Sequence, residues 1–382
     1  NVLKAAGYDV TREYYVNDAG NQMDIFYRSV YARYQQTLGY SVEFPANGYQ
    51  GDYIQDLARE IIDAEGTRFL GMDEDQAIKQ IGDLGREKMV ANIRADLDLV
   101  GVNFDNWFSE RSLFENQEYD RAMDRLRDKN YLSERENALW FNSSLLGDEK
   151  DNVVVRSTGE PTYFASDIAY HYNKFVERNF EQVIDIWGAD HQGHVPRMKA
   201  AVEALGVNPE ALTVLVTQLV TLKRGEETVR VSKRTGDFVT LNELVDEVGS
   251  DACRYFFLAR TPSTQMEFDL ELAKKESSEN PVYYIQYGHA RIASILSLAQ
   301  ERGLDWHAAD VRQECGTQSF ELIGPQGSAG RLRLGLTGQH NLRNALASLA
   351  AAAFAGFDPA TELADALEDF VGVRRRQEHL GT

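Results

Sequence analysis

The sequence predicts an α/β protein built around a parallel β-sheet. Two apolar segments, residues 182–187 and 213–222, have the composition of buried strands, and a helical segment at residues 195–205 lies between them. A β-branched and aromatic segment from Val10 to Val16 precedes a segment of helical spacing from Asn21 to Leu38. Strands that alternate with helices usually lie parallel in one sheet, with the helices packed on its faces. Such sheets bind their ligands beyond the carboxyl ends of the strands.

Further elements are predicted along the rest of the chain. The region from about Tyr53 to Asn130 has a highly charged helical pattern. A helix is expected to begin at Asp167, and a long amphipathic helix is expected from Ser278 to Leu298. The other predicted elements are a helical segment at 1–6, a strand at 153–156, a turn at 158–161, a strand at 331–334, a turn or helix start at 338–341 and a buried alanine-rich helix at 342–355.

Composition limits the class of protein. The chain has 382 residues, enough for two or three domains, and a formal net charge of −20, which argues against broad nucleic-acid binding. No apolar run approaches the roughly 20 residues that span a bilayer. The two cysteines, Cys253 and Cys315, are far apart and form no CxxC motif, so neither a disulfide framework nor a zinc site is indicated. These features predict a cytoplasmic protein.

A concentrated basic segment stands out in this acidic chain. Residues 230–236 combine a small hydroxyl, several cations and a glycine in Arg230, Ser232, Lys233, Arg234 and Gly236. The segment follows a predicted strand, so it lies where a mobile basic loop could fold over a polyphosphate. Taken alone, it is equally compatible with a solvated charged turn.

A second candidate site follows the predicted strand at 182–187. Gly188 lets a nucleotide approach the backbone closely, Asp190 can accept hydrogen bonds from ribose hydroxyls, and His191 can bond a polar substrate group. Asp190 could equally cap the following helix, and the two roles are compatible. His191 and His194 without a nearby third ligand make a weak metal pair, so no protein-bound metal is predicted.

Two more candidates involve carboxylates. Tyr163 and Asp167 stand four residues apart near a helix start, where the carboxylate can pair with a guanidinium and the tyrosine can cover its face. The alternative is that Ser166 and Asp167 are ordinary helix caps. Asp18 and Gln22 flank a glycine after the first predicted strand and could line a polar pocket, or could form a simple capping turn.

The order of these motifs resembles arginyl-tRNA synthetase, a class I aminoacyl-tRNA synthetase, from Asn1 to about Arg302. The resemblance rests on residues 10–22, the basic loop, residues 251–256 and residues 280–287. It implies a class I Rossmann-type parallel sheet in a catalytic domain at 1–270, with a helical insertion at about 50–135. Residues 271–302 would then begin an α-helical anticodon-binding domain.

The resemblance also implies an activity and a set of roles. ATP would activate arginine, and the activated arginine would pass to tRNA(Arg). The signature loop would act on the triphosphate through Lys233, helped by Arg230, Ser232 and Arg234, with Mg²⁺ only as the nucleotide's counter-ion. The other implied sites are Gly188, Asp190 and His191 for adenosine, Tyr163, Asp167, Asp18 and Gln22 for arginine, and Tyr283, Tyr287 and Arg291 for tRNA. We expect a monomer without membrane contact.

Several features depart from the family. The histidine-glycine signature of class I synthetases would precede Asn1, and the usual lysine and methionine of the closing loop are Arg230 and Val231 here. Since the chain also begins without a methionine or a signal peptide, we expect a fragment with impaired activity. A non-catalytic module that binds ATP or tRNA is the alternative.

Residues 303–382 resemble a different family, the Mur ligases, at the end of the central ATPase domain and the following hinge. The resemblance rests on residues 306–312, 338–345 and 370–378, and it implies that the turn at His340 to Asn344 contacts a nucleotide. No Gly-Lys-Thr phosphate loop occurs in the chain, so the tail alone is not expected to carry Mur-type amide ligase chemistry. The alternative is a packing helix with a buried histidine. The sequence leaves open whether the junction is a gene fusion, an assembly artefact or an engineered chimera.

Overall fold

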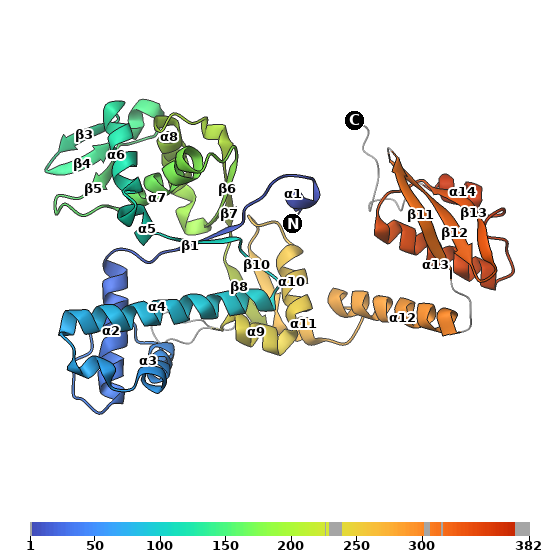
Figure 1. The fold of residues 1–382 in the computed structure, drawn as a ribbon, viewed down its shortest axis with the longest axis horizontal. Helices are drawn as coiled ribbons and strands as arrows, with labels where there is room; N and C mark the ends of the chain where they lie inside the picture. The colour runs from blue at the N-terminus through green and yellow to red at the C-terminus, as the bar shows by residue number, and fades with distance from the viewer. Residues whose placement is uncertain (1, 226, 229–238, 302–305, 315, 371–382) are drawn as a thin grey trace. The chain divides into compact units, whose positions relative to one another are not determined.

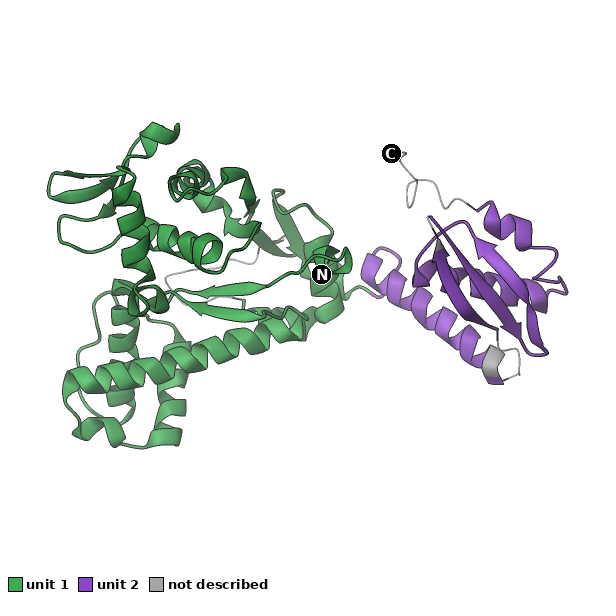
Figure 2. Cartoon of the chain, turned by 45° about the horizontal axis from the view of Figure 1, so that its top comes forward, with its two compact units in different colours: residues 1–275 green, residues 276–382 purple. Residues whose placement is uncertain are grey.

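The computed structural model describes residues 2–225, 227–228, 239–301, 306–314 and 316–370 (Figure 1). The chain divides into two compact units, residues 1–275 and residues 276–382, which are shown in Figure 2. The three-domain scheme with boundaries near 270 and 302 stays a prediction. The basic loop at 230–236, with Arg230, Ser232, Lys233 and Arg234, lies outside the described residues.

Among the residues that the structure describes, unit 1 contains three short parallel strand pairs, two of which lie in its first part. After the four-residue helix α1 (Val2–Ala5), strand β1 (Glu13–Val16) pairs in parallel with β2 (Asn106–Ser109). Aromatic neighbours hold this pair, since Tyr14 stacks on Trp107 with ring centroids 4.6 Å apart. Strand β6 (Val183–Gly188) pairs in parallel with β7 (Leu212–Thr217), and helix α8 (Val195–Ala204) connects them through the chain. The predicted parallel α/β arrangement is confirmed.

The strand β2 contradicts part of the sequence analysis. The whole region from Tyr53 to Asn130 was expected to be helical, but Asn106–Ser109 forms a strand between helices. The strand predicted at 182–187 was expected to be buried, and for one of its faces this is wrong. On β6 the side chains alternate, so Val183 is buried while Ile184 and Ile186 are 47% and 70% exposed.

Helix α7 (Tyr163–Tyr172) packs in the largest core of unit 1 and continues into a five-residue π-helical turn, η3 (Asn173–Glu177). The helix begins at Tyr163, four residues before the predicted start, because the side chain of Thr162 accepts a hydrogen bond from the backbone N–H of Ala165. The core around it includes Phe141, Ile168, Met198 and Leu205.

A second core of unit 1 belongs to a helical module made of α2 (Asn21–Thr37), α3 (Asp52–Glu65), a 3₁₀ turn η1 (Arg68–Gly71) and α4 (Glu74–Leu99). The predicted helix at 21–38 is confirmed. Gly82 lets α4 approach α2 closely, since a methyl group at position 82 would lie 2.1 Å from the ring of Tyr27. The 26-residue helix α4 begins at Asp73, whose side chain accepts from the backbone N–H of Gln76.

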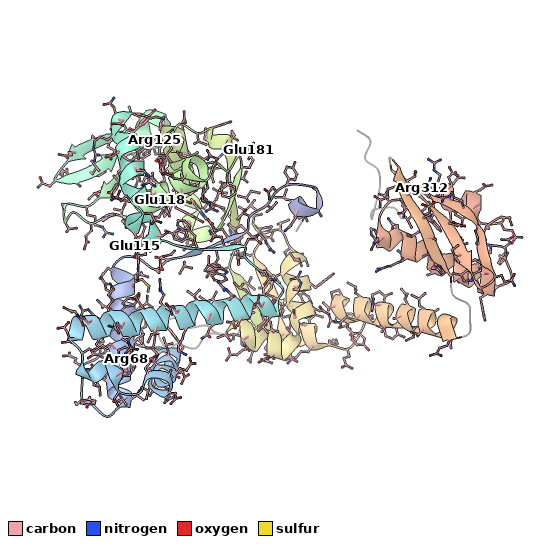
Figure 3. The ribbon with its side chains drawn as sticks, viewed as in Figure 1. Arg68, Glu115, Glu118, Arg125, Glu181 and Arg312 are labelled. Atoms are coloured by element: carbon pink, nitrogen blue, oxygen red, sulfur yellow. The ribbon has the colours of Figure 1, made fainter. Side chains whose placement is uncertain are left out.

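The rest of the first half of unit 1 surrounds α7. Helices α5 (Arg111–Glu115) and α6 (Glu118–Asp128) lead into an antiparallel sheet of β3 (Leu132–Arg135), β4 (Ala138–Phe141) and β5 (Asn152–Val155), with the 3₁₀ turn η2 (Ser143–Leu146) before β5. Arg125 on α6, labelled in Figure 3, donates to the carbonyl of Leu205 just after α8. This bond satisfies a carbonyl that the helix end leaves free.

The last part of unit 1 contains a three-stranded sheet of β8 (Val220–Arg224), β9 (Glu227–Thr228) and β10 (Met266–Asp269), with helices α9 (Leu241–Val248), α10 (Ser250–Leu258) and α11 (Leu270–Lys274). The single strand predicted at 213–222 is therefore wrong. The segment breaks at Gln218, whose backbone N–H donates to the carbonyl of Pro262, and its two halves join different sheets.

Unit 2 begins with the long helix α12 (Pro281–Glu301), which confirms the predicted amphipathic helix. It then forms an antiparallel sheet of β11 (His307–Glu314), β12 (Thr317–Gly324) and β13 (Gly327–Leu334), followed by α13 (Gln339–Phe354) and α14 (Ala364–Glu368). Leu342 and Leu349 of α13 are buried against Phe320 and Leu332 of this sheet. The suggestion of a buried histidine here is wrong, since His340 is exposed.

Candidate functional site

Helix α7 presents the clearest candidate site. Tyr163, its first residue, is 51% exposed, and Asp167 lies half-buried one turn later on the same side of the helix. Ser166 is buried, and Thr162 is the capping residue, so neither Ser166 nor Asp167 caps the helix. Burial raises the pKa of the Asp167 carboxyl, while the charges of His171, Lys174 and Arg197 oppose that rise.

A carboxylate that the sequence analysis missed lies beside this helix. Glu110 follows β2 and is 3% exposed. Its pKa is raised by burial and by the negative charges of Asp167 and Asp18, although hydrogen bonds with Ser166 and Tyr15 act in the opposite direction. Because the charge of Asp167 raises the pKa of the buried Glu110 carboxyl, a cation near these two carboxylates is favoured. Had residues 106–109 been taken as a strand, Glu110 would have stood out as a strand-end residue.

Asp18 lies at the carboxyl end of β1 and is already engaged by the protein. Its two carboxylate oxygens accept hydrogen bonds from Arg86 at 2.7 Å, from the hydroxyl of Ser109 at 2.8 and 2.9 Å, and from the backbone N–H of Arg111 at 3.1 Å. It does not cap α2, whose N-cap is Gly20. Asp18 therefore joins the ends of β1 and β2 through its hydrogen bonds. Gln22, by contrast, is exposed in the first turn of α2.

The end of β6 forms the other candidate. Residues 189–194 make a 3₁₀ turn, η4 (Ala189–His194), in which Asp190 and His191 are exposed. A methyl group at Gly188 would lie 2.7 Å from Oδ1 of Asp190, so a larger residue there would displace this exposed carboxylate. Neither Asp190 nor another side chain caps this turn. The structure brings Gly188, Asp190 and His191 together in one open turn.

The two histidines of this turn lie close together. The Nδ1 atoms of His191 and His194 are 3.5 Å apart, and burial, followed by Arg197 and His191, lowers the pKa of His194. Arg197, in the first part of α8, thus influences both His194 and Asp167. Among the described residues, no three His, Cys, Asp or Glu side chains are arranged to hold a metal ion.

The residues predicted to contact tRNA form a stripe on α12 in unit 2. The rings of Tyr283 and Tyr287 stack with centroids 6.4 Å apart, and Arg291 donates a 2.7 Å hydrogen bond to the hydroxyl of Tyr287. Spacings of four residues place all three on one side of the helix. Aromatic faces beside a guanidinium suit stacking and phosphate contacts.

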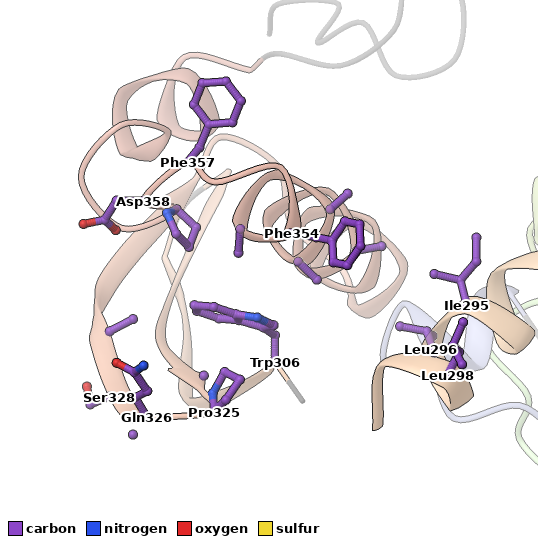
Figure 4. A pocket seen from close by; sticks show the side chains of 18 of the residues that line it. Ile295, Leu296, Leu298, Trp306, Pro325, Gln326, Ser328, Phe354, Phe357 and Asp358 are labelled. Carbon is purple, nitrogen blue, oxygen red and sulfur yellow. The ribbon is translucent and has the colours of Figure 1, made fainter. Parts of the chain in front are cut away.

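Unit 2 also contains an apolar cavity of about 950 Å³, shown in Figure 4. Trp306, Phe354 and Phe357 contribute large side chains to it, and Asp358 is the charged residue in its lining. None of the predicted site residues lines this cavity. In the part of the chain that the structure describes, no helix has the length and apolar character needed to cross a membrane.

Comparisons with known proteins agree with this geometry. A family model for the catalytic domain of class I (R) tRNA synthetases matches residues 1–261. The arginine–tRNA ligase of Dehalococcoides mccartyi strain BAV1 is 60% identical over 323 residues, which cover 85% of this chain and 58% of the relative. That of Syntrophotalea carbinolica is 51% identical over 322 residues, covering 84% and 58%. The chain thus spans less than two thirds of the length of these relatives.

Solved structures that align with this chain are also described as arginyl-tRNA synthetases. A Campylobacter jejuni protein described as an arginyl-tRNA synthetase aligns with a TM-score of 0.72 and 33% identity, covering 96% of this chain and 74% of that chain. The Thermus thermophilus arginyl-tRNA synthetase aligns with a TM-score of 0.56 at 17% identity, a likeness of fold. The resemblance of residues 303–382 to a Mur ligase, and the alternative of amide ligase chemistry, gain no support from these relatives.

Proposed function

This chain belongs to the arginyl-tRNA synthetase family, and we propose that it takes part in the ATP-dependent activation of arginine and its transfer to tRNA(Arg). The observation that carries the proposal is the pair of neighbouring carboxylates, the half-buried Asp167 on α7 and the buried Glu110 after β2, on the helix side that bears the exposed ring of Tyr163. A site of this composition suits a flat, permanently charged guanidinium.

Arginine recognition would use the two acids and the ring together. Asp167 and Glu110 would accept hydrogen bonds from the guanidinium, and Tyr163 would cover its face. Lysine carries a point charge, which would leave part of this acceptor set unpaired, so the site would discriminate against it. Asp18 would support the strand ends through Arg86 and Ser109. Gln22 remains a proposed neighbour of the substrate.

The nucleotide would lie at the end of β6. Gly188 would allow the close approach of the adenosine, with Asp190 and His191 bonding its polar groups. Lys233, with Arg230, Ser232 and Arg234, would balance the charge of the triphosphate, whose Mg²⁺ enters as a counter-ion. Catalysis would then consist of positioning arginine against the α-phosphate and stabilising the charge that develops in the transition state.

Transfer to tRNA would involve unit 2. The stripe of Tyr283, Tyr287 and Arg291 on α12 offers stacking surfaces and a cation to a nucleic-acid backbone. This local patch fits a protein whose overall charge of −20 opposes non-specific binding of nucleic acid. A monomer working in the cytoplasm, where proteins are synthesised, completes the proposal.

Isothermal titration calorimetry with arginine and its neutral isostere citrulline tests the proposal. The wild-type chain should bind arginine and discriminate strongly against citrulline, because citrulline cannot form the charged pair. Asp167→Asn should weaken arginine binding by about 100-fold, the loss expected when a charged hydrogen-bonding partner is removed. Asp124→Asn, an exposed change on α6, is the control and should bind as the wild type does. Equal binding of arginine and citrulline by the wild type would exclude the proposed site.

A further inference from the structure

A chain of buried hydrogen bonds connects α7 to β6 behind the proposed arginine site. Lys174 donates to Oδ1 of Asp185 at 2.7 Å, and Nε2 of His171 lies 2.9 Å from Oδ2 of the same carboxylate. The other ring nitrogen of His171, Nδ1, donates to the backbone carbonyl of Asp167 at 2.7 Å. This series of hydrogen bonds therefore ends on the backbone of Asp167, the residue proposed to bind the substrate guanidinium.

The two basic side chains in this series of hydrogen bonds are buried. His171 is 2% exposed and Lys174 is 5% exposed. Burial acts to raise the pKa of the Asp185 carboxyl. The hydrogen bond from His171 and the charge of Lys174 nevertheless hold that pKa below its ordinary value. Burying charged groups at this depth is costly unless they are paired, and apolar residues of the same size could fill the space equally well.

The same helix is also tied to the parallel pair of β1 and β2. Tyr170 donates a 2.5 Å hydrogen bond to Glu13 of β1, and Arg178, just after η3, donates to the same carboxylate at 2.7 Å. Bonds to β1 on one side and to β6 on the other restrict both rotation and sliding of α7. The position of Asp167 is thus determined by polar contacts with both strand pairs.

The charges around Asp167 come from several elements. Glu110 after β2, Asp185 on β6 and the ring of Tyr15 on β1 lie near it, and so do the basic side chains of His171, Lys174 and Arg197. The guanidinium of Arg197 lies 4.8 Å from the ring centroid of Phe164 and donates to Asn152 at 3.4 Å, while its Nε is buried without a hydrogen-bond partner. Burial lowers the pKa of the Lys174 ammonium, and its pairing with Asp185 opposes that lowering and holds the group in place.

We propose that His171 and Lys174 are positioning residues for substrate recognition, which fix Asp167 through Asp185 and balance its charge so that it meets a cation as a carboxylate. The π-helical turn η3 assists, because it places Lys174 opposite Asp185, and such turns often occur at functional sites. This inference rests on the proposed function, since it presumes that Asp167 binds the guanidinium of arginine.

The decisive test is the pH dependence of arginine binding in Lys174→Met and Lys174→Arg. Removing the Lys174 charge raises the pKa of the Asp167 carboxyl further, so arginine binding should be lost at a higher pH than in the wild type. Relative to the wild type, Lys174→Met should bind arginine several-fold more weakly at pH 6, because a larger share of its Asp167 carboxyl is protonated there. The difference should shrink as the pH rises to 8.5, and Lys174→Arg should restore the wild-type profile.

Controls separate this inference from the proposed function and from misfolding. Lys199→Met removes a lysine whose partner Glu210 is exposed, and should leave the profile unchanged. If the wild type does not bind arginine, the proposed function fails. If it does bind and Lys174→Met follows the same pH profile, the positioning role is wrong. Should Lys174→Met lose its circular-dichroism signal, His171→Gln replaces it, because the amide reaches Asp185 but not the carbonyl of Asp167. Wild-type arginine affinity in folded His171→Gln would likewise overturn the inference.

Discussion

Arg86, halfway along α4, donates a 2.7 Å hydrogen bond to the carboxylate of Asp18, which lies 68 residues earlier in the chain. The Asp18 side chain is 1% exposed, whereas that of Arg86 is 24% exposed. The same carboxylate accepts from Ser109 and from the backbone of Arg111, so one side chain joins the ends of β1 and β2 to the helical module.

Asp18→Asn should therefore destabilise unit 1. The amide keeps the size of the side chain but loses the charge that pairs with Arg86, and its NH₂ group faces donors. We expect a loss of about 1–3 kcal/mol in the free energy of unfolding, measured by urea denaturation. Asp56→Asn, which disrupts an exposed pair with Arg59, should change the midpoint little. Equal midpoints for both variants would contradict a structural role of Asp18.

Gly82→Ala should destabilise the helical module. Alanine normally favours a helix, but here its methyl group would lie 2.1 Å from the Tyr27 ring. Tyr27 cannot move freely, because its hydroxyl donates to Asp83 and accepts from Arg111, both at 2.6 Å. We expect a loss of about 1–3 kcal/mol from overpacking, measured by thermal unfolding. At Gly71 a methyl group meets nothing within 4 Å, so Gly71→Ala is the control.

Glu110→Gln should stabilise the protein at neutral pH while weakening arginine binding. The folded-state pKa of Glu110 is raised, so the destabilisation from its ionisation is absent below the unfolded pKa, grows as the pH rises from the unfolded to the folded pKa, and is constant above it. The melting temperature of the variant should exceed that of the wild type at pH 7.5, and the difference should vanish near pH 4. A difference that does not depend on pH would show that burial of the charge is not the cause.

Leu349→Ala should selectively destabilise unit 2. Leu349 is 1% exposed and packs with Phe320 and Leu332, so the truncation leaves a cavity expected to cost about 2–5 kcal/mol. Amide hydrogen exchange of residues 317–354 should report faster opening in that unit. Phe354, on the same helix, is 73% exposed, and Phe354→Ala should leave exchange nearly unchanged.

Much of the fold could be predicted from the sequence because long periodic segments form regular helices. The helices α2, α8 and α12 were expected within a few residues of their observed bounds. The strand β2 could not be predicted from the sequence pattern, because it has four residues and lies between charged helices. The segment at 213–222 is apolar throughout, so periodicity could not reveal that its two halves join different sheets.

The candidate site was only partly predictable, for a different physical reason. Tyr163 and Asp167 are close in sequence, so helical spacing alone brings them together. Glu110 reaches the same place through the pairing of β1 with β2, which is a contact between distant segments. The engagement of Asp18 by Arg86 likewise depends on the packing of α4, and no local pattern around residue 18 encodes it.

The pairing of β1 with β2 also has a consequence for synthesis on the ribosome. Glu13 and its partner Asn106 are 93 residues apart, so the first strand has no partner until the second emerges. At about 5–20 residues per second, that interval lasts about 5–20 seconds. During it, α2, α3 and α4 can bury their own core, which involves Val30, Ile54 and Ile81. Translation thus allows the helical module to fold first and to shorten the distance that the two strands must then close.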